Sequence, residues 1–538
     1  MNIKQLNEEI DKLFTDRLTY MMLLQEISEH FYPERADFTI NRSMGSEYAS
    51  GMMTSYPILV RRELGDQIGQ MLRPTGVVWH KMVPKYGEKA DNEGRRWLEW
   101  ANNRMRNAMM ARPALFERAA KMSDHDFAAF GCPVMTCRIN RNADNLIYRN
   151  WHIRDVVWKE NEEGGLGLVA RKWAPTARDL VSLFGDKVDP KVQRKLEKHP
   201  FEKVKCYHIE IEADLYSDSA KGRPLWSIYY DRENKHIMEA VPIWDREYII
   251  PRWQMVSGSQ YAFSPATITA LPEARMIQSM AFTILEAGEK ATNPPLIATQ
   301  DVVRSDVSIY AGGITWVDKD YDEKLGQALR PIPQDYRGLP FGQDMLMDSR
   351  ELIAQAFFLN KLTLPERAPE MTAYEVGQRI QEYIRGALPL FAPMEPEYNG
   401  GICETTFNKL MRAGVFGSPR DMPRSIATVG IDFEYISPLH DAIDEQKGQK
   451  FLETKALLAE AIDVDPGATY VLDTRIALRE AMEGIGVPAT WMRSKDDVEE
   501  MVEDEAQAIE QQAQLEQMVQ SSEVVKNIGA GSESLQGL

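Results

Sequence analysis

No stretch of this 538-residue sequence approaches the ~20 continuous apolar residues that a membrane-spanning helix needs. The best candidate, residues 352–359, is too short and contains Gln355. The first 14 residues mix both charge signs at helical spacing, a pattern unlike that of a cleavable secretion signal. We therefore expect a protein that has no membrane partner and stays in the cytoplasm where it is made.

Cysteine is scarce, and none of the four cysteines belongs to a CxxC pair. In a long cytosolic chain, Cys132, Cys137, Cys206 and Cys403 are expected to be buried apolar thiols. A zinc site made by the first three with nearby His208 is the alternative, but their spacing fits no common zinc module. The prediction is that the protein holds no metal and no cofactor.

The usual motifs of catalysis are missing as well. The sequence has no GxxxxGK[ST] phosphate loop, no HExxH and no GxSxG. Residues 165–170 spell GxGxxA, but they follow the turn-like residues 161–164 and no convincing helix comes after them, so a hairpin turn is favoured. No nucleophile, base and orienting group stand in a recognisable arrangement. These absences indicate that the protein is not an enzyme.

One short acidic motif is the exception to these absences. Asp124, His125 and Asp126 could form a metal or proton-transfer site. The apolar neighbours Phe127 and Phe130 place the motif on an amphipathic helix. A solvated face, or a face whose polar groups are satisfied within the protein, is the favoured interpretation.

Basic residues are outnumbered, with 63 Lys and Arg against 81 Asp and Glu, a formal net charge of −18. A tight nucleic-acid binder needs a basic face, and this sequence has no basic stripe. A conduit in which DNA must slide remains compatible with an acidic chain. Residues 494–538 carry eleven acidic residues against Lys495 and Lys526, which fits a solvated terminal helix, an acidic outer collar, or both.

The pattern of apolar residues predicts an α+β protein that is mainly helical. Residues 1 to about 125 show helical spacing, whereas residues 132–260 contain short segments rich in β-branched and aromatic residues, which are typical of antiparallel strands. Two long helices are expected at 265–292 and 343–360, and a compact mixed segment, 293–342, separates them. A loop, a third long helix from Thr372 and a strand near 431–436 follow, and the last residues are expected to be flexible.

Several segments together resemble the head-to-tail connector family, the portal proteins of short-tailed, podovirus-type phages. The early helix with its Leu-rich stripe, Pro and Trp is similar at 59–84. The Pro-x-x-Trp segment that leads through Gly and Ser-Pro into a long helix is similar at 249–280, and the Lys…Pro-Pro ending of that helix at 289–295. The Met-Thr-Ala…Val…Arg element is similar at 366–383. These matches come in the family's order and span roughly residues 55–500.

The resemblance implies a portal fold in a closed ring of twelve subunits around a central channel. The corresponding parts are a wing at 1–263, stem helices at 264–292 and 343–360, a clip at 293–342, a tunnel loop at 361–371, a wing return at 372–440 and a crown at 441–538. The tunnel loop of the family faces the channel, and here Lys361 and Arg367 are its cations. They could contact DNA, or they could simply solvate a surface loop.

The resemblance also implies partners and a location. The ring would sit at the portal vertex of the virion capsid, after assembly in the host cytoplasm with the major capsid and scaffolding proteins. Double-stranded DNA would pass through it, and the terminase large subunit and then tail adaptor or nozzle proteins would dock on it. The alternatives are a hydrolase or nuclease with an unrecognised site, and a tail adaptor or scaffold protein.

Overall fold

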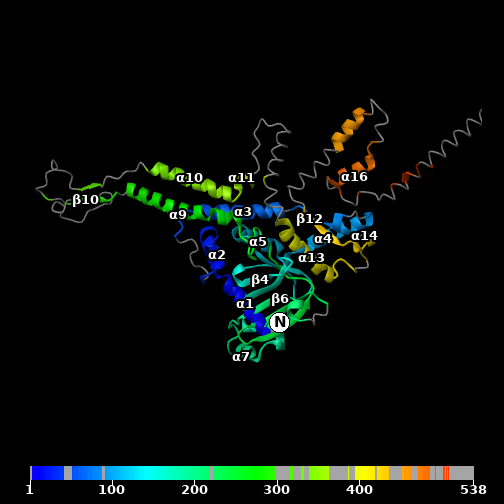
Figure 1. Cartoon of the computed structure of the whole chain (residues 1–538), viewed down its shortest axis with the longest axis horizontal. Coiled ribbons are helices and arrows are strands. Elements are labelled where there is room, and N and C mark those ends of the chain that lie inside the picture. Colours follow the sequence, from blue (N-terminus) through cyan, green and yellow to red (C-terminus); the bar gives the residue numbers. More distant parts are fainter. Residues whose placement is uncertain are drawn as a thin grey trace, which may run out of the picture. The chain divides into compact units, whose positions relative to one another are not determined.

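A computed structural model of the chain describes residues 3–41, 51–74, 76–87, 91–217, 222–292, 294–298, 329–331, 338–362, 394–418, 421–435, 451–461 and 471–484, together with single residues outside these ranges (Figure 1). The chain divides into two compact units. The larger comprises Met1–Thr75 and Ala108–Lys409, and the smaller comprises Gly76–Asn107 and Leu410–Leu538. The expected α+β, mainly helical class is confirmed.

The larger unit is built around a five-stranded antiparallel sheet with the strand order β4-β5-β6-β7-β8. The strands are β4 (Val156–Glu160), β5 (Leu166–Trp173), β6 (Cys206–Glu212), β7 (Leu225–Asp231) and β8 (His236–Ile243). All five lie within residues 132–260, where the sequence predicted antiparallel strands. The residues that spell GxGxxA form the turn of the β4–β5 hairpin and the start of β5, as expected.

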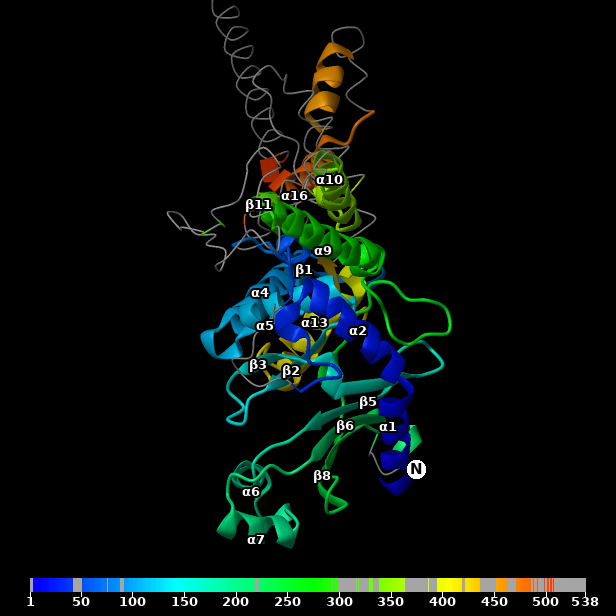
Figure 2. The same cartoon turned by 90° about the vertical axis from the view of Figure 1, so that its left-hand side faces the viewer.

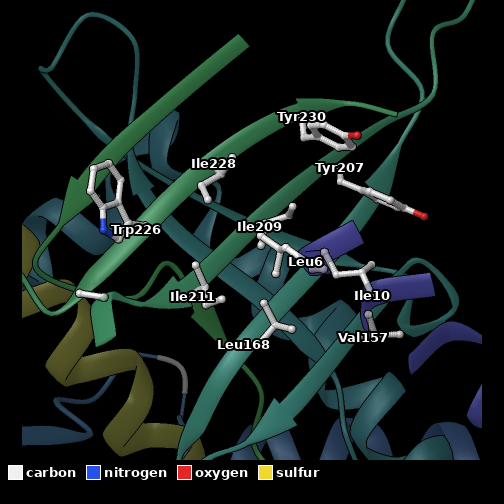
Figure 3. Packing of buried hydrophobic residues seen from close by; sticks show 12 residues of the cluster. Leu6, Ile10, Val157, Leu168, Tyr207, Ile209, Ile211, Trp226, Ile228 and Tyr230 are labelled. Atoms are coloured by element: carbon white, nitrogen blue, oxygen red, sulfur yellow. The ribbon is translucent and has the colours of Figure 1, made fainter. Parts of the chain in front are cut away.

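Helix α1 (Ile3–Asp16) covers one face of this sheet. Leu6 and Ile10 point from α1 toward Leu168, Ile209 and Ile211, and all five side chains are buried (Figure 3). Alternation along β6 explains the arrangement, because successive strand residues point to opposite faces. The apolar residues of β6 therefore face α1, while Cys206, His208 and Glu210 face the other way.

Two small helices, α6 (Ala177–Phe184) and α7 (Pro190–Lys198), connect β5 to β6. Thr176 caps α6 by accepting a hydrogen bond from the backbone N–H of Asp179, as a Thr at this position commonly does. Val192 of α7 is buried in a small core with Leu180 and Met238. This core fixes the α6–α7 pair against the sheet, and Figure 2 shows the pair at the lower left.

The other elements of the larger unit are helices and a second sheet. The helices are α2 (Leu18–Phe31), α3 (Tyr56–Leu72), α5 (Phe116–Phe130), α8 (Ala213–Tyr216), α9 (Pro265–Thr292), α10 (Leu339–Ala356) and α11 (Leu359–Leu362). The second sheet has the order β3-β2-β9, with β3 (Leu146–Trp151), β2 (Val134–Ile139) and β9 (Tyr248–Ile249). None of the helices in the described residues is long and apolar enough to cross a bilayer.

Helices α9 and α10 pack side by side as a long hairpin (Figure 1). Helix α9 spans 28 residues and is therefore ~42 Å long at 1.5 Å per residue. The short strands β10 (Leu296–Ala298) and β11 (Leu329–Pro331) pair beyond its end. The side chains of Ser264 and Thr267 donate hydrogen bonds of 2.7 and 2.8 Å to carbonyls at the end of α5, which fixes the start of α9.

The predicted helix bounds hold for α9 and need correction for α10. Helix α10 begins at Leu339, four residues before the expected start, because Pro340 lies in the first helical turn, where a proline is tolerated. Helix α10 ends before Phe358, whose backbone has a φ of 59°. The next helix, α11, includes Lys361 and Leu362. The predicted loop at 361–371 is therefore helical at its first two residues, and residues 363–371 lie outside the described residues.

The smaller unit contains β1 (His80–Pro84), which pairs with β12 (Ile431–Tyr435), and the helices α14 (Arg424–Ala427) and α16 (Thr474–Gly484). Helices α4 (Asn92–Met110) and α13 (Gly401–Arg412) each contribute residues to both units. The strand at 431–436 was predicted, whereas β1 lies in a stretch expected to be helical. The expected helix from Thr372 and most of the acidic segment 494–538 lie outside the described residues.

Candidate functional site

The two predicted site residues, Lys361 and Arg367, stand on either side of residue 362, the last residue of a described stretch. Lys361 belongs to the short helix α11, whereas Arg367 lies outside the described residues, so the structure does not bring the two together. Apart from Gly386, the described residues resume at Met394. The geometry of the site is therefore defined by its two ends, one at α10–α11 and one at residues 394–400.

The outgoing end is anchored by two consecutive phenylalanines. Phe357 is fully buried, and its ring lies 5.4 Å from that of Phe31 in α2. The backbone N–H of Phe358 donates a 3.0 Å hydrogen bond to the carbonyl of Gln355. A bulky residue with positive φ is rare, and here the buried neighbour Phe357 helps to hold the turn.

The returning end is anchored by a buried polar cluster. Arg73, at the C-terminal end of α3, donates a 2.7 Å hydrogen bond to Oδ1 of Asn399 and forms an ion pair with Asp124 of α5. The hydroxyl of Tyr398 donates a 2.7 Å hydrogen bond to Asp124, and the amide of Asn399 donates to the carbonyl of Leu72. Burial would lower the pKa of Arg73, but the Asp124 carboxylate outweighs it and raises this pKa. The cluster keeps the guanidinium charged.

A row of aromatic rings joins the two ends. The ring centroids are 6.4 Å apart between Phe358 and Trp253, 5.2 Å between Trp253 and Phe127, and 5.4 Å between Phe127 and Tyr398. Trp253 and Phe127 are stacked with an interplanar angle of 9°. Each such pair adds about 0.5–1.5 kcal/mol beyond the burial of its area. The described residues on either side of 363–393 thus lie at neighbouring points on one packed base.

The acidic motif of α5 belongs to this base and not to a catalytic centre. Asp124 and Asp126 are buried, and Asp126 pairs with Arg35 at 2.5 Å. His125 contacts Arg61, and burial together with that guanidinium lowers the pKa of His125. The face is therefore satisfied within the protein, as one of the two interpretations held, and it is not solvated.

The zinc alternative is wrong. The four cysteines are buried and free, and Cys132, Cys137 and Cys206 form no ligand cluster with His208. Burial raises the pKa of both Cys132 and Cys137 to about 11, so these thiols stay protonated and are poor metal ligands.

A different group, His208, Glu210 and Glu247, was not foreseen and does come together on the far side of the sheet from α1. Its geometry opposes a cation, because both ring nitrogens of His208 already have partners, Tyr248 at 2.7 Å and Ser227 at 3.0 Å. Burial lowers the pKa of His208, and so do the nearby guanidinium groups of Arg171 and Arg138. Burial raises the pKa of Glu210 to about 8, and the Glu247 carboxylate adds to this rise.

Comparison with known proteins covers most of the chain. The model of the family described as "Bacteriophage head to tail connecting protein" matches residues 3–492. The chain is 23% identical over 445 residues to the "Probable portal protein" of Bordetella phage BPP-1, which covers 80% of this chain and 78% of that protein. It is 22% identical over 422 residues to the "Portal protein" of Salmonella phage epsilon15, covering 76% and 74%.

These matches confirm the resemblance that the sequence segments indicated, and they exclude the hydrolase or nuclease alternative. The family is structural and non-enzymatic, and its members belong to the virion. The chain belongs to the family of bacteriophage head-to-tail connecting proteins, the portal proteins at the capsid vertex.

Proposed function

We propose that this portal protein assembles into a closed ring through which double-stranded DNA enters and leaves the capsid. The expected number of subunits is twelve. The observation that carries the proposal is the α9–α10 hairpin, which is long and keeps large apolar side chains in contact with water. Phe282 and Leu285 of α9 are 53% and 54% exposed. Further exposed apolar residues of the hairpin are Ile268, Met276, Phe341, Met345, Met347 and Leu352.

An apolar surface of this kind supports association with another protein chain. In a ring, one face of each subunit meets a different face of the next, so a hairpin could be covered on both sides by its two neighbours. Burial of Phe and Leu side chains stabilises such a contact by about 1.5–3 kcal/mol each. The hairpin is therefore proposed as the stem of the ring, with α9 and α10 as the two stem helices.

The remaining parts follow from their places in the chain. The wing is proposed at 1–263, the clip between the stem helices at 293–338, the tunnel loop at 361–371, the wing return at 372–440 and the crown at 441–538. The first two residues of the tunnel loop belong to α11. The clip would be the docking site of the terminase large subunit during packaging and of tail adaptor or nozzle proteins afterwards. The major capsid and scaffolding proteins would surround the wing.

The tunnel loop is proposed to meet DNA through Lys361 and Arg367. The proposal is supported by the packed base described above, which holds the described residues on both sides of 363–393 at neighbouring points. Each contact between a cation and phosphate is weak and depends on salt, as a channel with sliding DNA requires. The formal net charge of −18 is compatible with a wall that repels phosphate over the ~8–10 Å that physiological salt leaves unscreened.

Electron microscopy of the purified protein tests the ring directly. Negative-stain images should show closed rings with a central hole, and class averages should give the number of subunits. A tail adaptor or scaffold role would instead predict particles without a closed ring. Uniform small monomers at high protein concentration would contradict the proposal.

A further inference from the structure

We propose that an acidic pocket at one end of the five-stranded sheet receives helix α7 and Phe201 of a second copy of this chain. The contact would join neighbouring wings, in addition to any contact between stems. This inference rests on the ring proposed above.

The pocket is a cavity of about 530 Å³ between α1, the β4–β5 hairpin and α8. Its floor is apolar, because Leu6, Leu168 and Ile211 of the core line it. Leu215 of α8 adds an apolar wall. Around this floor stand six acidic side chains and one basic side chain, Lys159. A volume of this size and an apolar floor are typical of sites that accept a side chain or small ligand.

Half of the acidic side chains already have partners. Glu9 pairs with Lys159 at 2.6 Å, Glu160 pairs with Arg252, and Glu212 accepts a 2.9 Å hydrogen bond from Asn161. The other three, Glu162, Glu163 and Asp214, are exposed and form no ion pair with any residue that the structure describes. The rim therefore presents uncompensated negative charge beside an apolar floor, which favours a partner with cations around an apolar group.

The chain carries such a group on α7. Lys191, Arg194 and Lys198 are exposed and follow one another at spacings of three and four residues, so they share one face of the helix. None of the three pairs with an acidic side chain in the described part of the chain. Lys195, by contrast, is held by Glu202 at 2.8 Å and Glu233 at 3.4 Å.

Phe201 lies three residues after the end of α7 and is 71% exposed, which is unusual for a side chain of its size. An aromatic residue that enters an apolar pocket, with charged pairs around it, is a common centre of a protein interface. Phe201 supplies the aromatic group, and the three cations of α7 supply charges opposite to those of the pocket rim.

A subunit cannot fill its own pocket with its own α7. The α6–α7 pair lies between Trp173 and Cys206, which are paired at one end of strands β5 and β6. The pocket lies at the other end of the same strands, where Leu168 pairs with Ile211. Five residue steps of ~3.3 Å separate these two ends by roughly 16 Å. In Figure 2, α7 is accordingly at the lower left and α1 at the right.

Two complementary surfaces at opposite ends of one sheet are what a head-to-tail contact requires, and head-to-tail contacts form a ring when the rotation between neighbouring copies closes. Two charge-reversal variants test the pairing. The first changes the pocket rim, Glu162→Lys with Glu163→Lys and Asp214→Lys. The second changes the helix, Lys191→Glu with Arg194→Glu and Lys198→Glu. Circular dichroism checks that both fold like the parent protein, and mass photometry during dilution measures the concentration at which half of the subunits are in rings.

Each variant alone should raise that concentration by about tenfold or more, because three favourable charge contacts become repulsive at every junction. An equimolar mixture should form rings again, because a reversed rim is complementary to a reversed helix and the unchanged surfaces still match. Phe201→Ala should weaken rings without changing their salt dependence. The control is Arg112→Glu with Arg118→Glu, which changes one exposed residue in the 3-10 turn before α5 and one in α5, and it should behave like the parent.

Variants that assemble like the parent at both low and physiological salt would overturn the contact. Variants that fail to assemble and are not restored by mixing would overturn it too, because their defect would then not lie in this pairing. A parent protein that forms no ring at any concentration would instead refute the proposed ring itself, so the two failures are distinguishable.

Discussion

Arg73 at the end of α3 donates a 2.7 Å hydrogen bond to Oδ1 of Asn399, a residue 326 positions later in the sequence. The same guanidinium is paired with Asp124, and it lies with its central carbon 4.3 Å from the centre of the Tyr398 ring. One buried cation thus connects residues 398 and 399, which follow the proposed tunnel loop and wing helix in the sequence, to helices α3 and α5. The position of Tyr398 and Asn399 depends on this contact.

Removal of the Arg73 guanidinium should lower the free energy of unfolding. Arg73→Ala leaves the buried carboxylate of Asp124 without its partner, and breaking a buried pair in this way destabilises a protein by about 3–5 kcal/mol. Chemical denaturation at fixed protein concentration measures the change in the free energy of unfolding. The matched control is Arg275→Ala, because Arg275 and Glu26 form an exposed pair worth at most about 1 kcal/mol. Equal small losses in the two variants would contradict the role of Arg73.

The buried carboxyl of Glu210 should make stability fall as pH rises. Its pKa in the folded protein is about 8, above its value of 4.5 in the unfolded chain, so between these values the folded state binds more protons. The stabilisation is complete below pH 4.5 and is lost as pH rises toward 8. The useful window is pH 6.5–8, because the lowered pKa of His208 produces the opposite trend only below about 6.5.

The variant Glu210→Gln removes this titration. The free energy of unfolding of the parent should decrease by up to about 1.4 kcal/mol per pH unit across pH 6.5–8, and the variant should show a flatter profile. The comparison needs denaturation curves at four pH values for both proteins. Parallel profiles would mean that Glu210 is ionised in the folded protein throughout this range.

Substitutions on the stem hairpin should separate folding from assembly. Phe282→Glu with Leu285→Glu places two charges on the exposed apolar face of α9, where they do not disturb the buried residues Ile277 and Ala281. The subunit should fold with an unchanged circular dichroism spectrum, but rings should be lost in negative-stain images. Leu18→Glu on α2 is a suitable control, because this exposed side chain lies outside the hairpin. Rings of the double variant would rule out α9 as a stem contact.

Local patterns allowed much of the fold to be predicted. The bounds of α9 were predicted because its apolar residues repeat with helical period and Asn293-Pro294-Pro295 ends the helix. Strands between residues 132 and 260 were predicted because short segments rich in β-branched and aromatic residues occur there. Family membership was predicted from segments whose order along the chain is characteristic.

Contacts between distant residues were beyond this kind of prediction. Strand β1 is only five residues long, and its partner β12 lies some 350 residues later, so no local pattern marks it as a strand. The burial of Asp124 and Asp126 depends on Arg73 and Arg35, which come from other helices. The acidic pocket likewise draws its lining from three separate segments. Buried acidic residues usually pair with cations, so the sequence could have suggested that Asp124 and Asp126 have basic partners. It could not have identified those partners as Arg73 and Arg35.

The last prediction concerns the proposed DNA contact of the tunnel loop. Pro365 and Pro369 disfavour helix at the residues before them, so the sequence predicts a non-helical segment after α11. In a ring whose stem is the α9–α10 hairpin, an excursion between stem and wing would be directed toward the axis. Lys361→Glu with Arg367→Glu replaces two attractions to phosphate by two repulsions. Ring assembly should be unaffected, because neither residue belongs to an apolar stripe.

Packaged DNA per assembled head should fall in this double variant, and the loss should be greater at low ionic strength, where charges are least screened. The measurement is DNA yield per head at two salt concentrations, with ring assembly checked in parallel. The control Lys187→Glu with Lys203→Glu reverses two exposed cations near α6–α7, far along the chain from the excursion, and should leave packaging per assembled ring unchanged. A double variant that fills and retains DNA like the parent at both salt concentrations would show that the loop does not contact DNA, even if the ring itself is confirmed.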